Sequence, residues 1–223
     1  MLSIVIPTLN AKSGLRSCLD MATQSPIKYE LVVADGGSND GTVELAQNMG
    51  CKLVATPKGR GLQLKAGATA AEGDWLLFLH ADTQLEASWG EALISFIAQP
   101  NAKQKAAYFT FALNDRSADA RRVENMVAWR CENMALPYGD QGLLISRELY
   151  NAVGGYEAVP LMEDVGLVRR IGPERLVCLP IKAITSAVRF QKGGYILRPL
   201  RNIFCLGLYL LGVSPRTIVK FYQ

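Results

Sequence analysis

The stretch Trp75-Leu76-Leu77-Phe78-Leu79-His80-Ala81-Asp82-Thr83 decides the fold of this 223-residue chain. It runs through five apolar residues without a break and then turns polar. Such a run is typical of a central strand of a parallel sheet, buried on both faces. Ligands of open parallel sheets bind beyond the carboxyl ends of the strands, so Asp82 is predicted to lie at a functional edge. The alternative left open is a loop aspartate that caps the next helix.

Three further short apolar runs in the first half each end at a polar or glycine-rich loop. These runs cover residues 2–6, 31–34 and 52–55, and helix-like stretches follow at 14–22, 41–49 and 62–71. Strands that alternate with helices of this length predict βαβ units and a parallel sheet. In the second half the patterns predict strands at 106–113 and 143–145, and helices at 117–135 and 163–170.

The loop Asp35–Thr42 is both acidic and rich in glycine. Gly36 and Gly37 permit backbone angles closed to other residues and allow a ligand to approach the backbone closely. Ser38 or Asp40 can cap the helix that follows. An ordinary connection between a strand and a helix is the alternative reading of the same loop.

Five motifs follow one another at residues 3–10, 33–42, 79–83, 139–142 and 162–167. The first reads Ser-Ile-Val-Ile-Pro-Thr-Leu-Asn, and the last two read Gly-Asp-Gln-Gly and Met-Glu-Asp-Val-Gly-Leu. In this order they resemble family 2 glycosyltransferases of the GT-A fold, and the tail resembles a small bacterial family-2-like subgroup. The resemblance implies an α/β fold with a Rossmann-like, mostly parallel central sheet, flanking helices and a C-terminal apolar helix.

The resemblance also implies an activity: one metal-assisted, inverting transfer of a sugar from a nucleotide-diphosphate-sugar, expected to be a UDP-sugar, to an unidentified acceptor. Asp82 matches the last aspartate of the family's Asp-x-Asp motif and would bind Mn²⁺ or Mg²⁺. Asp164 matches the catalytic base, with Glu163 beside it. Thr8 and Asp35 match positions that hold the nucleobase and ribose. The other residues expected at the donor are Pro7, Asn10, Gly61, Lys65, His80, Ala81, Asp140 and Gln141.

The chain departs from the family pattern in three places. His80 stands where the Asp-x-Asp motif has its first acidic residue, and Gly36 stands where a second aspartate often follows Asp35. Both changes concern the identity of the donor more than the type of reaction. The Gln-x-x-Arg-Trp motif of processive polysaccharide synthases is absent, which favours a single transfer over chain elongation.

The expected chemistry fits the residue types. A cation at Asp82 would stabilise the negative charge that grows on the leaving diphosphate, and Asp164 would accept the proton of the acceptor. Glu163 and Asp164 also suit the first turn of a helix, where the helix dipole favours acidic residues. Asp140 has a similar alternative role in a turn. His80 is the one histidine of the chain, which excludes a histidine-rich zinc site.

Composition sets the broad class. A chain of 223 residues, 49% hydrophobic and 20% charged, can bury a core as a single domain. We expect a nucleotide-sugar-binding half at 1–113, an acceptor-side half at 114–190 and a basic, apolar helical tail at 191–223. The net charge of +4 is too modest to indicate nucleic-acid binding.

Five scattered cysteines without a Cys-x-x-Cys pair favour a reduced, cytoplasmic compartment. Because the N-terminus enters a strand at once, no signal peptide is expected.

The tail combines basic and apolar residues. The basic segment 189–202 is expected to close over the diphosphate, to touch anionic lipid, or simply to face solvent. Residues 203–213 are apolar on every side but too few to span a bilayer, which takes about 20 residues. They form a core helix, a homodimer contact or a peripheral anchor on the inner face of the membrane.

Two other classes of function stay open. A nucleotidyltransferase would normally carry a glycine-rich, basic loop after the first strand, where this chain has Pro7-Thr8-Leu9-Asn10. A non-catalytic nucleotide-sugar-binding module would explain His80, but the presence of both Asp82 and Asp164 speaks against it.

Overall fold

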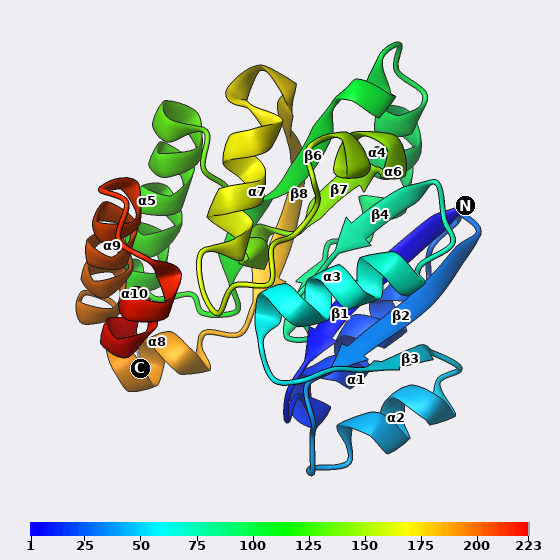
Figure 1. Cartoon of the computed structure of the whole chain (residues 1–223), viewed down its shortest axis with the longest axis horizontal. Helices are drawn as coiled ribbons and strands as arrows, with labels where there is room; N and C mark the ends of the chain where they lie inside the picture. The colour runs from blue at the N-terminus through cyan, green and yellow to red at the C-terminus, as the bar shows by residue number, and fades with distance from the viewer. Residues whose placement is uncertain (223) are drawn as a thin grey trace.

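A computed structural model describes residues 1–222, which form an eight-stranded sheet flanked by helices (Figure 1). The strand order is β3-β2-β1-β4-β7-β6-β8-β5. The strands are β1 (Leu2–Thr8), β2 (Tyr29–Asp35), β3 (Lys52–Ala55), β4 (Trp75–Phe78), β5 (Thr83–Leu85), β6 (Ala106–Leu113), β7 (Leu143–Ser146) and β8 (Leu176–Thr185). The sheet takes strands from both predicted halves, 1–113 and 114–190.

The helices cover both faces of the sheet and one end of the molecule. They are α1 (Lys12–Ala22), α2 (Thr42–Asn48), α3 (Arg60–Ala70), α4 (Trp89–Ile97), α5 (Ala118–Met134), α6 (Arg147–Ala152), α7 (Glu163–Ile171), α8 (Val188–Gly193), α9 (Leu197–Leu210) and α10 (Pro215–Tyr222). Helices α8, α9 and α10 lie at the end opposite the N-terminus (Figure 1). Within residues 1–222, no helix combines the length and the apolar composition that crossing a membrane requires.

The first half forms the predicted parallel sheet. Strand β1 lies between β2 and β4 and runs parallel to both, while β3 pairs with β2. All residues of β4 are buried, which confirms the prediction of a central strand. Leu2, Ile4 and Ile6 face the core under α1, whereas Val5 packs on the opposite side against α3. The helices on both sides therefore explain why the strands are apolar throughout.

The second half makes the sheet mixed. Strand β7 runs antiparallel to both β4 and β6, β8 runs parallel to β6, and β5 closes the edge antiparallel to β8. The predicted strands at 106–113 and 143–145 and the helices at 117–135 and 163–170 are confirmed within a few residues. The sequence patterns did not predict β5, β8, α4 or α6.

One detail of the deciding stretch differs from expectation. Strand β4 ends at Phe78, so Asp82 does not end the strand itself. It lies in the following turn, in which the Thr83 N–H donates to the His80 carbonyl at 3.1 Å. This turn brings His80 and Asp82 beyond the carboxyl end of β4, where ligands of such sheets bind.

The start of α3 predicts a sharp effect of substitution. A Cβ added at Gly61 would collide with the Glu157 carbonyl oxygen and lie 2.7 Å from that of Val159. Because both obstacles are backbone atoms, Gly61→Ala is expected to destabilise the protein by about 1–3 kcal/mol. Urea unfolding of the variant measures this free energy.

Gly207 in α9 provides the matched control, because a Cβ added there meets nothing within 4 Å. Gly207→Ala should keep or raise stability, since alanine favours a helix over glycine by about 1 kcal/mol. Equal effects of the two substitutions would contradict the packing argument.

Candidate functional site

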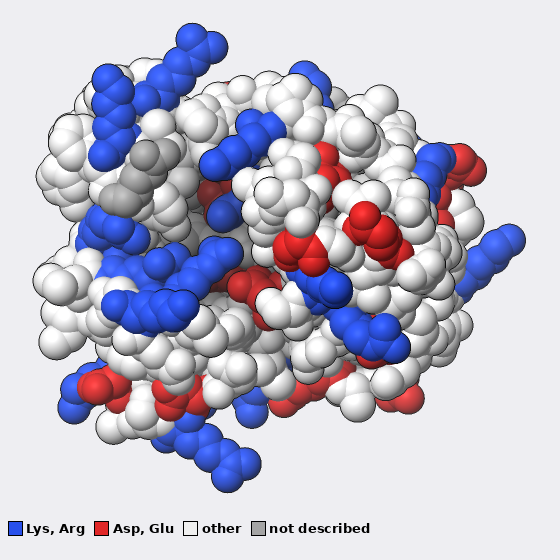
Figure 2. All heavy atoms as spheres, turned by 90° about the horizontal axis from the view of Figure 1, so that it is seen from below, with Lys and Arg blue, Asp and Glu red and all other residues white. Residues whose placement is uncertain are grey.

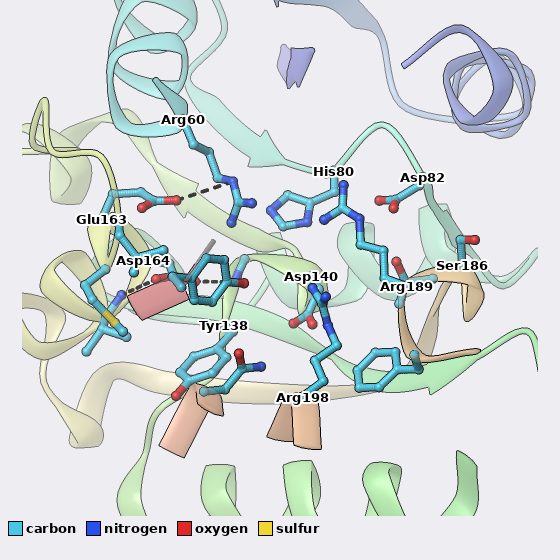
Figure 3. A pocket seen from close by; sticks show the side chains of 18 residues that line it. Arg60, His80, Asp82, Tyr138, Asp140, Glu163, Asp164, Ser186, Arg189 and Arg198 are labelled. Atoms are coloured by element: carbon cyan, nitrogen blue, oxygen red, sulfur yellow. Dashed lines mark hydrogen bonds and ion pairs between the residues drawn. The ribbon is translucent and has the colours of Figure 1, made fainter. Parts of the chain in front are cut away.

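A cleft of about 810 Å³, counting its open mouth, lies beyond the carboxyl ends of β4 and β8. Its walls come from the start of α3, the turn after β4, the η2 turn (Gly139–Gln141), the start of α7, the segment after β8, and α9 and α10. Figure 3 shows the side chains of these segments pointing toward one another. Segments far apart in the chain thus build one site.

Three of these segments meet at Gly139. Its backbone N–H donates to Asp164 Oδ2 at 2.9 Å, which ties the η2 turn to the start of α7. A Cβ added at Gly139 would lie 2.8 Å from His80 Nε2. The β4 turn, the η2 turn and α7 approach so closely here that a side chain in place of Gly139 would force the His80 ring to shift.

The two adjacent carboxylates of α7 lie in different surroundings. Glu163 is 2% exposed, and its Oε1 lies 3.6 Å from Arg60 Nε. Burial and the neighbouring charge of Asp164 raise the pKa of Glu163, although Arg60 opposes the shift. Asp164 remains partly exposed and lines the cleft. The residue before them, Met162, has a φ of 65°, a left-handed conformation that is uncommon outside glycine.

Several polar groups of the cleft have unmet hydrogen-bonding capacity. Among residues 1–222, Asp140 Oδ1 and His80 Nε2 are buried without a hydrogen-bond partner, as are Glu163 Oε1 and Asn202 Oδ1 in the same lining. Burial raises the pKa of Asp140 to about 6, with Arg130 opposing and Asp164 reinforcing the shift. Burial, followed by the charges of Arg60 and Arg189, lowers the pKa of His80 well below its usual value. Such orphaned groups in a cleft are typical of a site for a polar ligand.

Basic side chains surround these acids. Arg60 begins α3, Arg189 lies in α8 and Arg198 lies in α9, and all three line the cleft. Figure 2 shows lysine and arginine side chains gathered beside the hollowed part of this face, with acidic atoms deeper inside. The structure thus places part of the basic segment 189–202 at the cleft, while Arg60 was not predicted from the sequence.

Thr8 and Asp35 lie together but outside the cleft lining. The two are opposite each other in the β1–β2 pair, and Thr8 Oγ1 donates to Asp35 Oδ1 at 2.8 Å. Partial burial raises the pKa of Asp35, but hydrogen bonds from Ser38, Thr8 and Gly37 outweigh this and lower it. The carboxylate is therefore held by protein donors at the ends of two strands. Its contact with a nucleoside stays a prediction.

Gln63 is a buried residue of this region that sequence analysis missed. Its Nε2 donates to the carbonyl oxygens of Thr8 and Ala34, which bridges the ends of β1 and β2. A Cβ added at Gly36 would lie 3.2 Å from the Gln63 side chain. A side chain at this position would therefore require the Gln63 amide to shift by a few tenths of an ångström. No motif marks Gln63, because a lone glutamine within a helix carries no signal of its own.

Arg130 is a second missed residue. It donates from Nε to the Leu136 carbonyl at 2.8 Å and from Nη2 to Gln141 Oε1 at 3.0 Å. Its guanidinium also lies 3.5 Å from the centroid of the Tyr138 ring. Arg130 therefore clamps the turn that carries Gly139 and Asp140.

The remaining predicted site residues divide into two groups. The cleft brings together His80, Asp82, Asp140, Glu163 and Asp164. Outside its lining lie Pro7, Thr8, Asn10, Asp35, Gly61, Lys65, Ala81 and Gln141. The Gln141 side chain makes its hydrogen bonds within the protein: it accepts from Arg130 and donates to the Phe109 carbonyl at 3.1 Å. Asn10 accepts from the Asn39 N–H at 2.9 Å and so braces the loop after β2.

Comparison with known proteins identifies the family. The family model described as "Glycosyl transferase family 2" matches residues 3–147. A "PGL/p-HBAD biosynthesis glycosyltransferase" of Mycobacterium tuberculosis is 41% identical over 108 residues, which are 44% of this chain and 42% of that protein. The match thus spans less than half the length of this curated relative.

Two solved structures are similar in fold. Glucosyl-3-phosphoglycerate synthase of Mycobacterium tuberculosis, in complex with Mn²⁺, UDP and glucosyl-3-phosphoglycerate, has a TM-score of 0.59 and 20% identity over 83% of this chain and 70% of that one. A mannosyltransferase of Pyrobaculum calidifontis, in complex with GDP-Man and Mn²⁺, has a TM-score of 0.61 and 18% identity over 90% of this chain and 59% of that one. At these identities the likeness shows the fold, and it confirms the predicted GT-A class.

The raised pKa of Glu163 predicts a dependence of stability on pH. The folded protein holds the proton of Glu163 at a pH where the unfolded chain releases it, so this residue's contribution to stability falls as pH rises through the window above the usual value of 4.5. Glu163→Gln removes the titration. Relative to the parent, the variant should therefore gain stability between about pH 5 and pH 8 in urea unfolding.

Asp115→Asn is the matched control. Hydrogen bonds from Tyr195, Ser117 and Gln191 lower the pKa of Asp115, so its carboxylate is ionised in the folded protein throughout this range. Removing it should change stability by the same amount at both pH values. A Glu163→Gln effect that is equally independent of pH would refute the prediction.

Proposed function

The chain belongs to glycosyl transferase family 2, and from this we propose that it transfers a sugar from a nucleotide-diphosphate-sugar to a hydroxyl acceptor. The transfer is a single inverting displacement assisted by a divalent cation, and a UDP-sugar is the expected donor. The solved structures with UDP or GDP-Man and Mn²⁺ support this choice of donor and cation. The acceptor is taken up from the mouth of the cleft.

The observation that carries the proposal is the position of Asp164. Figure 3 shows Asp164 and Asp82 on opposite sides of the cleft. An inverting reaction needs a base that faces the anomeric carbon from the side opposite the leaving group. Asp164 would accept the proton of the acceptor hydroxyl while the acceptor oxygen bonds to the anomeric carbon and the bond to the diphosphate oxygen breaks.

Glu163 is less suited to this role. Its side chain is buried against Arg60, whereas Asp164 is partly exposed and is oriented by the Gly139 N–H. Adjacent residues of a helix also point about 100° apart. We assign Glu163 to the positioning of Arg60 and of the first turn of α7, and the base to Asp164.

The residues present fit a cation that is shared with the donor. Across residues 1–222 there is no group of three or more His, Cys, Asp or Glu side chains placed to hold a metal ion. Mg²⁺ is usually held by one or two carboxylates together with substrate phosphates, which Asp82 and the donor diphosphate would supply. His80 Nε2, which has no hydrogen-bond partner within residues 1–222, is a further atom in the same turn that could bind the cation. When bound, the cation supplies Lewis-acid stabilisation of the leaving diphosphate.

Arginines supply the remaining positive charge. Arg189 lies beside Asp82 and Ser186 in the cleft, and Arg198 lies beside Asp140 (Figure 3). Guanidinium groups bind phosphate oxygens through paired hydrogen bonds. Both residues are therefore placed to hold the diphosphate of the donor and to offset its charge as it leaves.

The family match disfavours the nucleotidyltransferase alternative. A non-catalytic binding module is tested directly by hydrolysis of a panel of nucleotide-sugars with and without Mn²⁺. The cytoplasmic location, and a contact of the tail with a membrane or a second copy, stay predictions.

Asp164→Asn tests the base. The change keeps the shape of the side chain but removes its basicity, so hydrolysis of the preferred nucleotide-sugar should fall by roughly 10²–10⁴-fold. Donor binding, measured by calorimetry, should stay nearly unchanged. If Asp164→Asn hydrolyses at the parent rate while Glu163→Gln is inactive, the base is Glu163. Full activity of both variants would exclude the proposed mechanism.

Asp82→Ala tests the cation site. If Asp82 holds the cation against the donor diphosphate, the variant should lose the part of the UDP affinity that depends on Mn²⁺. Calorimetric titration of UDP with and without Mn²⁺ measures this part. Asp119→Ala, at an exposed position of α5, is the control and should titrate like the parent. An unchanged metal-dependent affinity in Asp82→Ala would place the cation elsewhere.

A further inference from the structure

Helix α9 turns its most apolar side toward solvent. Six large apolar residues of α9 and its C-terminal end, which we call the apolar ridge, are between 45% and 83% exposed. They are Leu197, Leu200, Ile203, Phe204, Leu210 and Leu211. Their spacings of three, four and seven residues place them on one face of the helix.

The opposite side of α9 faces the protein. Its buried residues are Pro199, Cys205 and Leu206. The same side carries two arginines: Arg198 lines the cleft, and Arg201 stacks over the Tyr222 ring at 5.2 Å. A surface helix of a soluble protein normally has the reverse arrangement, with its apolar side inward. A contiguous exposed apolar surface of this kind marks an interaction site.

Charge identifies the partner. Residues 188–222, which span α8 to α10, contain six Lys and Arg and no Asp or Glu, whereas residues 1–187 contain 18 basic and 20 acidic residues. Lys192, Arg216 and Lys220 are exposed in the helices around the ridge and lie outside the cleft lining. The chain thus concentrates its positive charge on the segment that also exposes its apolar side chains. This combination is complementary to an anionic, apolar surface.

We propose that α8, α9 and α10 dock onto an anionic lipid bilayer, with the apolar ridge inserted among the acyl chains and the basic side chains on the headgroups. Helix α9 has 14 residues, and spanning a bilayer takes about 20, so the helix lies along the surface. A second copy of this chain is a poorer occupant, because a symmetric contact through the ridge would bring two strongly basic segments together.

Docking would bring the bilayer to the cleft. Arg189, Arg198 and Tyr222 belong to the docking helices and also line the cleft. On the proposed glycosyltransferase function, on which this step rests, the acceptor is then a hydroxyl group carried at the lipid surface. It would enter the cleft beside the basic residues that bind the donor diphosphate.

Cosedimentation with lipid vesicles tests the docking surface. The probes are vesicles of phosphatidylcholine alone and of an equal mixture with phosphatidylglycerol. The parent should bind the mixed vesicles and not the neutral ones, and high salt should weaken the binding. The triple variant Leu200→Ser/Phe204→Ser/Leu211→Ser and the double variant Lys192→Glu/Lys220→Glu should each bind the mixed vesicles roughly tenfold or more weakly.

Ile94→Ser/Trp129→Ser is the matched control, since both side chains are exposed apolar residues outside the ridge, at 46% and 59% exposure. It should bind like the parent. None of the substituted residues lines the cleft, so every variant should still hydrolyse nucleotide-sugars. If the parent itself does not hydrolyse them, that result counts against the proposed function and not against the docking. A parent that ignores anionic vesicles, or a triple variant that binds them fully, overturns the docking proposal. So does a dimeric parent that the triple variant converts to monomer.

Discussion

The close approach of three chain segments at Gly139 is the constraint on which the cleft depends. The backbone N–H of Gly139 holds Asp164, and a Cβ at this position would lie 2.8 Å from His80 Nε2, so a side chain there would force the ring to shift. Arg130 fixes the same turn from behind through Leu136 and Gln141. The parallel half of the sheet, through the β4 turn, and the antiparallel addition, through η2 and α7, are thereby held in one arrangement. These contacts link the position of Asp164 to that of the turn that carries His80 and Asp82.

The same packing leaves charge in the cleft that the protein does not neutralise. Asp140 and Glu163 both have raised pKa values because burial penalises their charged forms, and Arg60 lies 3.6 Å from Glu163 rather than in close contact. A protein selected for stability alone would pair these groups or replace them with apolar residues. Beside Arg189 and Arg198, these groups suit a ligand with both anionic and hydroxyl groups. The proposed nucleotide-sugar donor has this character.

Much of the architecture could be predicted from the sequence because its signals are local. The apolar runs that became β1, β2 and β4 are mostly buried, β3 is a more exposed edge strand, and each run ends at a loop with its own composition. Asp82 and Asp164 could be named because they sit in motifs with a fixed order along the chain. By contrast, β8 was missed although Leu179, Ile181, Ala183 and Thr185 alternate with more exposed residues. Pro180 disguises this strand, since proline is unusual within a sheet. Gln63, Arg60 and Arg130 were missed because their roles come from tertiary contacts alone.

In the tail, the sequence pattern does not predict which side of the helix is buried. Residues 203–213 are apolar on every side, so their periodicity cannot say which side faces the protein. The structure answers this through Cys205 and Leu206, which pack with Val165, Val168 and Ile218, while Arg198 lines the cleft. Because Cys205 and Leu206 pack inward, the helical repeat places Leu197, Leu200 and Phe204 outward. The packing of α9 against α7 and α10 thus determines both that Arg198 lines the cleft and that the apolar ridge is exposed, so the proposed transfer and the proposed docking depend on one helix orientation.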